Sequence, residues 1–369
     1  MTGTARDPAR AAQQPPPAES AGHDLPERLW EAVIAGDEFV AVDTVLAAVD
    51  GGTGIEELLL DVIAPLQARV GLEWAADRMT VAQEHTATAV SERLIAALAH
   101  HPAARRRTAR PAGRVTAACI DGEWHALPAR IVAEVLRLRG WQVDYLGAQV
   151  PTPHLIAHVH RTGPAVVALS SSIPTRLPDA HAAITACRAT GTPVLVGGAA
   201  YGTDGRYAAL LGADAWAPDA RSAADRLAAG PLPAPPPPYQ ALDDLPHLAD
   251  QEYAHVRREA PRLVRHVMER LRDRFPAMAD YTDRQLRHTA EDIAHIVDFL
   301  AAALYVDDPA LLTDFLTWTG EILSARGVPA RSLPPALELL ADRLTDYPRA
   351  AGMLLGAHTA MLREPSPAG

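Results

Sequence analysis

The stretch VTAACIDGEWHALP, residues 115–128, decides the fold. Its first six residues are mostly apolar and β-forming, and they predict a short buried strand. The segment DGEWHALP, residues 121–128, follows that strand directly and opens a helical pattern. A polar loop in this position lies at the carboxyl edge of a parallel sheet, which is where such sheets bind ligands.

The alternation of strand and helix continues from this stretch toward the carboxyl terminus. Short apolar runs predict strands over 115–120, 141–147, 165–172, 193–198 and 213–218. Helical patterns follow the strands over 127–140, 153–163, 177–191, 204–212 and 219–230. This order predicts a Rossmann-like domain over 113–230, built on a five-stranded parallel doubly wound sheet and belonging to the α/β class.

The residues on the amino-terminal side of the sheet form helical patterns. Four amphipathic helices with short connections predict a four-helix bundle over 25–104, with a kink at Pro65 in the third helix. Asp37 and Thr80 are expected to cap the second and fourth helices. Residues 1–24 are rich in Pro, Ala and polar side chains, and they predict a disordered tail.

A proline tract separates the sheet from a second helical region. The sequence PLPAPPPP at 231–238 predicts a stiff polyproline linker. After it, residues 239–365 contain helical patterns and no strand pattern, so we expect one all-α domain there.

Composition excludes several classes of protein. The chain has 369 residues, a formal net charge of −11 and 2 cysteines, so a broad nucleic-acid-binding surface and a disulfide framework are not expected. No apolar run is long enough for a transmembrane helix, and the first residues lack the apolar core of a signal peptide. We therefore expect a cytoplasmic protein without membrane partners. The chain shows no Walker motif, no GxGxxG motif and no nucleophile arrangement, so we do not expect an enzyme.

The loop at 121–128 offers a candidate metal ligand. His125 lies at the predicted ligand-binding edge, and Glu123 or Asp121 could orient its second ring nitrogen. The alternative is that His125 is an ordinary polar loop residue.

Glu123-x-His125-x-x-Pro128 resembles the Asp-x-His-x-x-Gly signature of cobalamin-binding domains. The resemblance implies that His125 replaces the cofactor's own base as the lower axial cobalt ligand. Ser170-Ser171-Ser172 and Gly197-Gly198 stand where that family has a serine element after the third strand and a glycine pair after the fourth. Small residues there let backbone approach the displaced nucleotide tail closely. The cofactor-binding set implied in this region is Glu123, His125, Ser170, Ser172, Gly197 and Gly198. This chain departs from the signature with Glu at 123 and Pro at 128.

A second motif lies in the bundle. Residues 75–83 separate Trp74 from Glu84-His85, a spacing similar to the upper cap of light-sensing, CarH-like adenosylcobalamin photoreceptors. The resemblance implies that Trp74 packs on the adenosyl group while Glu84 and His85 hold its polar parts. Ala75 stands where some of these proteins place a second cobalt-ligating histidine. Their DNA-binding helix-turn-helix domain has no counterpart in residues 1–24, so we do not expect direct nucleic-acid binding.

The order of bundle, sheet, proline tract and helical domain resembles photocobilins, which pair adenosylcobalamin with biliverdin. The resemblance implies a phycobiliprotein-like carboxyl-terminal domain that holds biliverdin without a covalent bond. Propionates and pyrrole nitrogens need cationic and acceptor side chains, and Trp318 and Tyr305 could stack on the pigment. The candidate polar residues lie along one predicted helix: Arg284, Arg287, His288, Asp292 and His295. The alternative is a solvated charged helix face.

The sequence thus predicts a light sensor that binds adenosylcobalamin and biliverdin, forms light-dependent homo-oligomers and signals to an unknown output protein. A corrinoid carrier protein of a methyltransferase system is one alternative. A bilin- or haem-binding sensor with a vestigial cobalamin fold is another. His154, His158 and His160 include a pair with metal-ligand spacing, but without a carboxylate partner in view we expect an exposed helix face.

Overall fold

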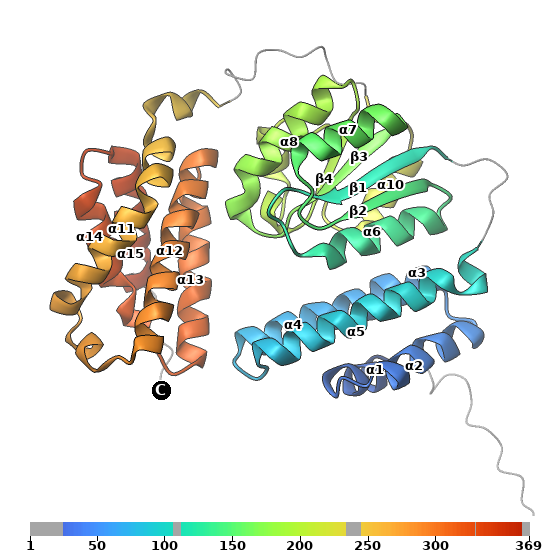
Figure 1. Cartoon of the computed structure of the whole chain (residues 1–369), viewed down its shortest axis with the longest axis horizontal. Coiled ribbons are helices and arrows are strands. Elements are labelled where there is room, and N and C mark those ends of the chain that lie inside the picture. Colours follow the sequence, from blue (N-terminus) through green and yellow to red (C-terminus); the bar gives the residue numbers. More distant parts are fainter. Residues whose placement is uncertain (1–24, 106–111, 234–244, 329, 364–369) are drawn as a thin grey trace, which may run out of the picture.

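A computed structural model describes residues 25–105, 112–233, 245–328 and 330–363 (Figure 1). The tail expected over 1–24, most of the linker expected over 231–238, and residues 239–244, 364 and 365 of the expected all-α domain lie outside the described residues.

Four antiparallel helical segments form the amino-terminal bundle. The structure contains α1 (Leu25–Ile34), α2 (Glu38–Asp50), α3 (Ile55–Glu57), the π-helical turn η1 (Leu58–Ile63), α4 (Ala64–Ala75), α5 (Val81–His100) and the short turn η2 (Pro102–Ala104). Asp37 accepts a hydrogen bond from the Val40 amide at 3.0 Å, and Thr80 forms a capping box with Gln83. Both predicted caps are therefore present, and fully buried Leu29, Leu58 and Leu94 fill the bundle core.

The third helix departs from the prediction at Pro65. In place of a simple kink, the six residues of η1 adopt π-helical geometry just before the proline, and the Ala64 amide bonds to the Leu59 carbonyl. Pro65 has no amide hydrogen to donate to the carbonyl of Asp61, so the regular α-helical ladder is interrupted at this turn. The interruption directs Leu60 and Asp61 toward the sheet domain, where they line a cavity.

The sheet has the predicted five parallel strands in the order β2-β1-β3-β4-β5. They are β1 (Arg114–Cys119), β2 (Gln142–Gly147), β3 (Val166–Ser170), β4 (Val194–Gly197) and β5 (Ala215–Ala217). The register pairs Cys119 with Ser170, Ser170 with Gly197, and Gly197 with Ala217. The serine and glycine elements named above therefore lie side by side at the carboxyl edge.

Helices cover both faces of the sheet, and each face belongs to a different hydrophobic core. On one face, α6 (Ala126–Leu138) and α10 (Ala220–Ala228) share a core with the bundle. Figure 1 shows α6 between the sheet and the bundle. On the other face lie α7 (Thr152–Thr162), α8 (Leu177–Ala189) and α9 (Arg206–Leu210), whose core continues into the carboxyl-terminal helices. The short turns η3 (Pro174–Arg176) and η4 (Ala199–Tyr201) follow β3 and β4.

The carboxyl-terminal region is helical over its described residues. We call α11 (Glu252–Arg274), α12 (Asp283–Val306), α13 (Pro309–Ala325), α14 (Pro334–Arg343) and α15 (Pro348–Arg363) the helical block. The turns η5 (Pro246–Asp250), η6 (Pro276–Asp280) and η7 (Ala330–Ser332) accompany these helices.

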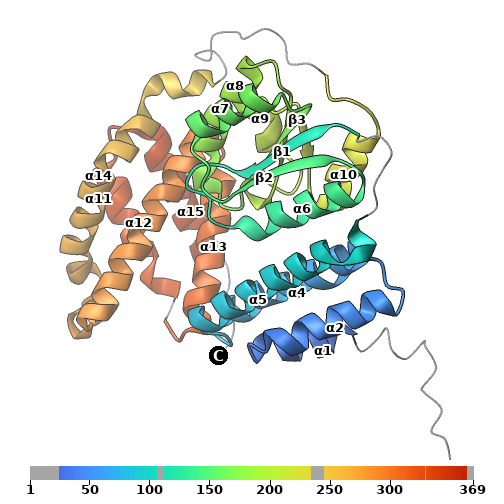
Figure 2. The same cartoon turned by 45° about the vertical axis from the view of Figure 1, so that its right-hand side comes forward.

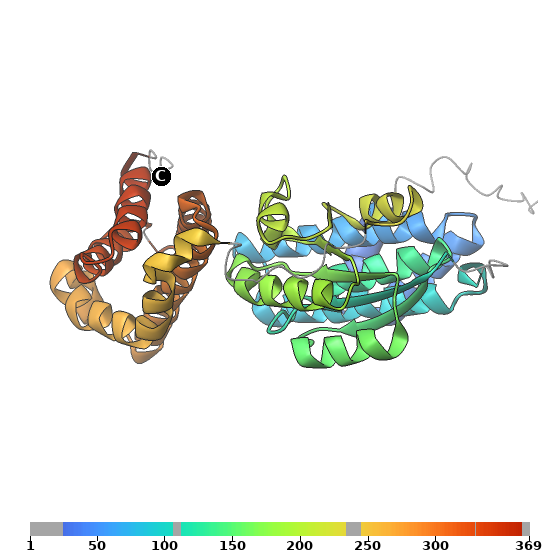
Figure 3. The ribbon, with the colours of Figure 1, turned by 90° about the horizontal axis from the view of Figure 1, so that it is seen from above.

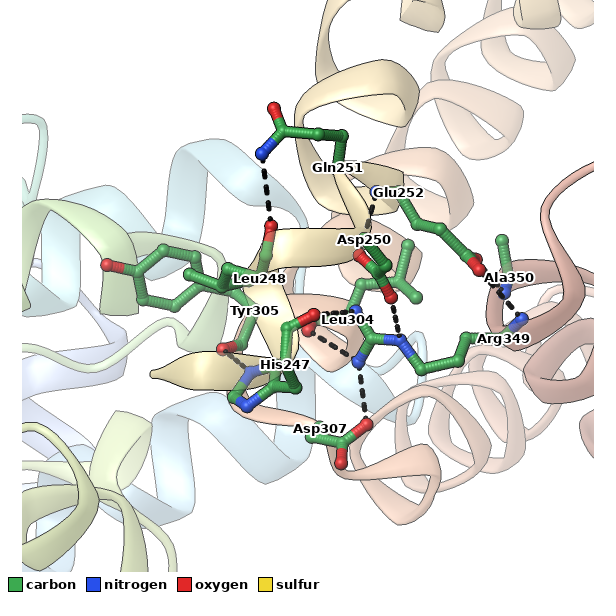
Figure 4. Close-up of polar contacts among 10 residues, drawn as sticks. All are labelled: His247, Leu248, Asp250, Gln251, Glu252, Leu304, Tyr305, Asp307, Arg349 and Ala350. Atoms are coloured by element: carbon green, nitrogen blue, oxygen red, sulfur yellow. Dashed lines mark hydrogen bonds and ion pairs between the residues drawn. The ribbon is translucent and has the colours of Figure 1, made fainter. Parts of the chain in front are cut away.

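Arg349 holds the start of the helical block to its end (Figure 4). Its guanidinium pairs with Asp250 and Asp307, at 2.6 Å in each case. Buried Glu252 accepts hydrogen bonds from the amides of Arg349 and Ala350 at 3.2 and 2.8 Å. This network fixes η5 and α11 to the first turn of α15.

The helical block stands at one end of the molecule (Figure 3). Its helix α12 packs against η3 and α8, which follow the carboxyl end of β3. Figure 2 shows α13 next to the tip formed by α4 and α5, and these two regions are in contact. Within the described residues, no helix combines the length and apolarity needed to cross a bilayer.

Candidate functional site

Glu123 and His125 form a tight pair at the carboxyl edge of the sheet. One carboxylate oxygen, Oε1, lies 2.6 Å from Nδ1 of His125 and also accepts a hydrogen bond from the His125 amide at 2.9 Å. Glu123 is fully buried, whereas the His125 side chain is 33% exposed and stands at the N-cap of α6. The sequence left Glu123 and Asp121 as alternatives for this contact, and the structure gives it to Glu123.

The other Glu123 oxygen, Oε2, is held by the segment after β3. It accepts hydrogen bonds from the hydroxyl of Ser171 at 3.3 Å and from the amides of Ser172 and Ile173 at 2.6 and 3.2 Å. Burial by itself raises the pKa of Glu123, but the hydrogen bonds from His125 and Ser172 outweigh burial and bring it to about 2. The carboxylate is therefore ionised, so Nδ1 of His125 carries the proton and Nε2 is the nitrogen available to a metal.

The sequence reasoning missed two residues of this site. Trp124 stacks on the His125 ring, with 3.9 Å between ring centroids and 53% of the indole exposed. The signal available in the sequence was a tryptophan between the two motif residues of a predicted loop. Ser171 was quoted in the motif without a role, yet its side chain bonds Glu123, whereas Ser172 contributes its backbone amide.

A cavity of about 550 Å³ lies between the sheet and the bundle. Its walls come from η1 and α4 on the bundle side, from α6 and α10, and from the carboxyl halves of β1, β3, β4 and β5. Ser170, Gly197 and Gly198 line it, so the structure brings these three predicted residues to one space. Most of the lining is apolar, which suits an aromatic or aliphatic ligand segment.

The predicted close approach of backbone to a nucleotide tail stays a prediction, and the close contact in this structure is an internal one, made by Gly198. Its φ is +103°, and a Cβ built on it would lie 2.2 Å from the carbonyl oxygen of Ser171. A Cβ on Gly197 would lie 3.0 Å from the Ala217 carbonyl oxygen. Both positions therefore favour glycine, and the first excludes a side chain in this backbone geometry.

The bundle presents a polar group to the same cavity. Gln67 lines it and donates a hydrogen bond to the Thr88 hydroxyl at 2.7 Å. Thr88 in turn donates to Glu84 at 3.0 Å, and the other Glu84 oxygen lies 2.5 Å from His85 Nδ1. Within the part of the chain that the structure describes, the buried Oε1 of Gln67 has no hydrogen-bond partner. A ligand with an amide or hydroxyl donor would satisfy it.

Trp74 lies in the last turn of α4, at the tip of the bundle, where it meets the helical block. Its ring centroid is 6.4 Å from that of Trp318 on α13, and the Arg326 guanidinium lies over the Trp74 ring at 5.1 Å. Asp77 lies 3.7 Å from Arg326. Neither Trp74 nor the Glu84-His85 pair is among the residues that line the cavity. Their predicted contact with an adenosyl group stays a prediction.

The candidate pigment-binding residues do lie along α12. Arg284, Arg287, His288 and His295 are exposed, and Arg284 and Glu291 both contact His288. Asp292 is half-buried; burial raises its pKa, although His295, His288 and Arg326 act in the opposite direction. Trp318 is 46% exposed, and Tyr305 contacts His181 of the sheet domain. The 550 Å³ cavity is not lined by residues of the helical block.

The expectation for the three histidines of α7 is corrected for one of them. His154 and His160 are exposed as expected, but His158 is half-buried and its Nε2 lies 3.1 Å from Asp144. Asp144 comes from the neighbouring strand β2, which spacing along the helix could not reveal. No group of three or more His, Cys, Asp or Glu side chains among the described residues could hold a metal ion.

Comparison with known proteins agrees with this geometry. Residues 113–228 match a family model described as B12 binding domain, and residues 25–99 match a second model with the same description. The chain is 32% identical over 199 residues to the HTH-type transcriptional repressor CarA of Myxococcus xanthus. It is 34% identical over 163 residues to the HTH-type transcriptional repressor CarH of the same organism.

These similarities cover parts of each chain. The CarA alignment covers 52% of this chain and 63% of CarA, and the CarH alignment covers 43% and 51%. The monomethylamine corrinoid protein of Methanosarcina barkeri superposes with a TM-score of 0.50 at 17% identity, over 56% of this chain and 98% of that protein. The last match shows a shared fold. Together, the comparisons show that this chain contains B12-binding domains and is similar to CarA and CarH.

The residues present fit a cobalamin. A corrin ring supplies the equatorial nitrogens of its cobalt, so the protein needs to contribute one axial ligand rather than a cluster, and His125 offers Nε2. The nucleotide tail of a cobalamin needs a narrow apolar space, which the cavity at Ser170, Gly197 and Gly198 provides. The unpartnered oxygen of Gln67 suits the amide groups that surround a corrin.

Proposed function

We propose that this chain is a light sensor that binds adenosylcobalamin between its bundle and its sheet domain. The observation that carries the proposal is the Glu123–His125 pair, in which a buried carboxylate fixes the imidazole with Nε2 available. The cavity, which Leu127 and Pro128 of the same segment line although Glu123 and His125 do not, supports the proposal. The two B12-binding domains and the similarity to CarA and CarH support it as well.

In this proposal His125 would hold the cobalt through Nε2, with Glu123 orienting the imidazole ring and increasing its basicity. Ser170, Gly197 and Gly198 receive the nucleotide tail between the strands. Gln67 offers its free oxygen to a donor on the corrin periphery. When bound, adenosylcobalamin supplies a cobalt–carbon bond that visible light cleaves.

Trp74, Glu84 and His85 are proposed to cover the adenosyl group from the bundle side. Trp74 offers an indole face for the purine, and Glu84 offers a carboxylate for ribose hydroxyls. Loss of the adenosyl group would leave these three side chains without their partner and would free the bundle to shift relative to the sheet. Such a two-state element would change contacts between copies of the chain and would pass the signal to another protein without enzymatic chemistry.

The test of the lower ligand is an absorption spectrum of the protein with adenosylcobalamin, before and after green light. The parent is expected to show a histidine-coordinated corrinoid that photolyses, and His125→Ala is expected to lose that coordination and bind more weakly. His154→Ala is the control, because His154 is exposed on α7. Equal affinity and an equal spectrum in the parent and the His125→Ala protein would overturn the proposal.

The cap is tested separately with Trp74→Ala. We expect weaker binding of adenosylcobalamin than in the parent and an altered photoresponse, with hydroxocobalamin binding affected less. If adenosylcobalamin binding and the photoresponse were both unchanged, Trp74 would have no capping role.

A corrinoid carrier of a methyltransferase system is the second candidate. The fold shared with the monomethylamine corrinoid protein favours it, since that protein also pairs a helical cap with this kind of sheet domain. A carrier would prefer methylcobalamin and would exchange its methyl group with a methyltransferase. A preference for adenosylcobalamin together with photolysis favours the sensor.

Biliverdin is a further proposed ligand, held by the helical block. The support is the polar face of α12 with Asp292 half-buried, and the exposed indole of Trp318 next to Trp74. Protein loaded with biliverdin is expected to absorb red light, and Asp292→Ala is expected to shift or remove that band. A pigment that is removed by gel filtration in the parent would contradict this part of the proposal.

A further inference from the structure

The segment that holds Glu123 also connects it to the helical block. Two of the three donors to Glu123 Oε2 are the consecutive amides of Ser172 and Ile173. The next residues form η3, so any displacement of η3 moves these amides directly. The position of the Glu123 carboxylate, and therefore of the His125 ring, depends on where η3 lies.

Arg176, the last residue of η3, touches the histidine loop from a second direction. A Cβ built on Gly122 would lie 2.7 Å from Arg176 Nη1 and 2.9 Å from Cζ, so the guanidinium rests on the backbone just before Glu123. Gly122 has a φ of +73°, a conformation that favours glycine. Because glycine has no side chain, the backbone of the turn is open to this contact. Asp179, one turn further along the chain, lies 3.8 Å from Arg176.

The helical block packs on the same segment. Helix α12 contacts η3 and α8. Three polar contacts hold the two parts together beside it: His181 to the Tyr305 hydroxyl at 2.8 Å, Tyr207 to Asp308 at 2.7 Å, and Arg206 to Asp308 at 3.3 Å. The route from α12 to His125 is therefore continuous, through η3 and Glu123.

We propose that Arg176 is a positioning residue for His125, and that the docking of α12 on η3 regulates how well His125 coordinates the cobalt of a bound corrinoid. This inference rests on the proposed function, because it concerns the same axial ligand. It adds that the helical block, which contributes no ligand of its own to the cobalt, controls the lower face of the site through η3.

The experiment titrates the chain of residues 1–369 with cobinamide, a corrin that lacks the nucleotide tail. Because cobinamide has no nucleotide tail, its binding does not depend on contacts in the tail cavity. Its absorption spectrum therefore reports histidine coordination of the cobalt. Arg176→Ala is expected to weaken coordination about tenfold, within the range found when a partner of a metal ligand is removed. Arg176→Lys is expected to restore part of it, because a cation again rests on Gly122.

The matched control is Arg161→Ala. Arg161 is an exposed arginine in the last turn of α7, at the opposite edge of the sheet. Its substitution is expected to leave histidine coordination unchanged. Asp308→Asn removes the charge that pairs with Arg206 across the docking contact. We expect it to weaken histidine coordination as well, but less than Arg176→Ala does. The thermal midpoint of each protein without corrinoid shows whether the fold is intact.

The two proposals fail in different ways. If the parent binds cobinamide without histidine coordination, and His125→Ala behaves identically, the proposed function fails. If the parent is histidine-coordinated, and Arg176→Ala and Asp308→Asn match it in affinity and spectrum, the proposed function stands and this inference is overturned.

Discussion

At the scale of single residues, Glu123 is the most constrained group of the site. Its carboxylate is fully buried and accepts hydrogen bonds from two loops, those of His125 and of Ser171–Ile173. A buried carboxylate is stable only when such donors replace its water. The same contacts that make it a partner for an axial histidine also join the first and third strands at their carboxyl ends.

The stability of the protein without corrinoid is expected to depend on Glu123 in acid. The pKa of this group is about 2 in the folded chain and 4.5 in an unperturbed one. Its stabilising contribution is thus complete above about pH 4.5 and is lost as the pH falls toward about 2. Thermal midpoints of the parent and Glu123→Gln should differ most near neutral pH and converge in acid. A difference that is constant with pH would contradict the assignment.

Gly198→Ala tests the close approach of backbone at the cavity. Both Gly198 and Gly147 have positive φ, but only Gly198 has atoms within 4 Å of a built Cβ. Gly198→Ala is therefore expected to lower the free energy of unfolding by about 1–3 kcal/mol more than Gly147→Ala. Urea denaturation measures the free energy of unfolding of both variants. Equal losses would show that the Ser171 carbonyl can move away from the new methyl group without destabilising the fold.

At the scale of secondary-structure elements, Asp308 both caps α13 and contacts the sheet domain. One oxygen caps α13 by accepting from the Ala310 amide at 2.9 Å, and the other accepts from the Tyr207 hydroxyl. Asp37, which is exposed, has the capping role alone, at the start of α2. We expect Asp308→Ala to lower the free energy of unfolding by about 1 kcal/mol more than Asp37→Ala, because it also removes the hydrogen bond to Tyr207.

A double-mutant cycle with Tyr207→Phe measures that hydrogen bond directly. The coupling free energy between Asp308→Ala and Tyr207→Phe is expected to be about 1 kcal/mol. Additive losses in the two single variants would mean that the Tyr207–Asp308 hydrogen bond contributes nothing to stability.

The elements themselves were largely predictable from sequence. Apolar runs such as AVVALSSS and caps such as Thr80 give local signals, and both the strand β3 and the start of α5 lie where these signals indicate. The π-helical geometry before Pro65 was not predictable, since a proline interrupts a helix without specifying how the preceding turn adjusts. The expected domain limits and the pigment-binding role of the helical block stay predictions.

The site was predictable in its motif and less so in its contacts. The spacing of Glu123 and His125 indicated a ligand with a partner carboxylate, because both residues lie in one loop. The contacts of Trp74 with Trp318 and of His158 with Asp144 join different elements. No local pattern encodes such pairs, which arise only when the elements pack together.

At the scale of the whole molecule, the helical block contacts both other parts of the chain. It reaches the bundle through Trp318 and Arg326, and it reaches the sheet domain through α12 on η3 and α8. A shift of the bundle relative to the sheet would therefore stretch or break at least one of these two contacts.

The bundle contact is the smaller one, so we expect it to yield first. A Trp318→Ala/Arg326→Ala variant removes the ring contact with Trp74 and the charge near Asp77. Its radius of gyration, measured by X-ray scattering in the dark, is expected to exceed that of the parent. Leu355→Ala removes an exposed apolar side chain from α15 and serves as the control. Identical scattering from all three proteins would contradict this role of Trp318 and Arg326.

The two cysteines have a practical consequence for following such a shift. Cys119 and Cys187 are the 2 cysteines of the sequence, and both are completely buried. Burial raises the pKa of each thiol to about 12, and for Cys119 the charge of Glu123 adds to the effect. Maleimides react with thiolates, so the native thiols should stay unlabelled in the folded chain. Fluorophores attached to new cysteines on exposed bundle and block positions would then report distances during illumination without any native cysteine being replaced.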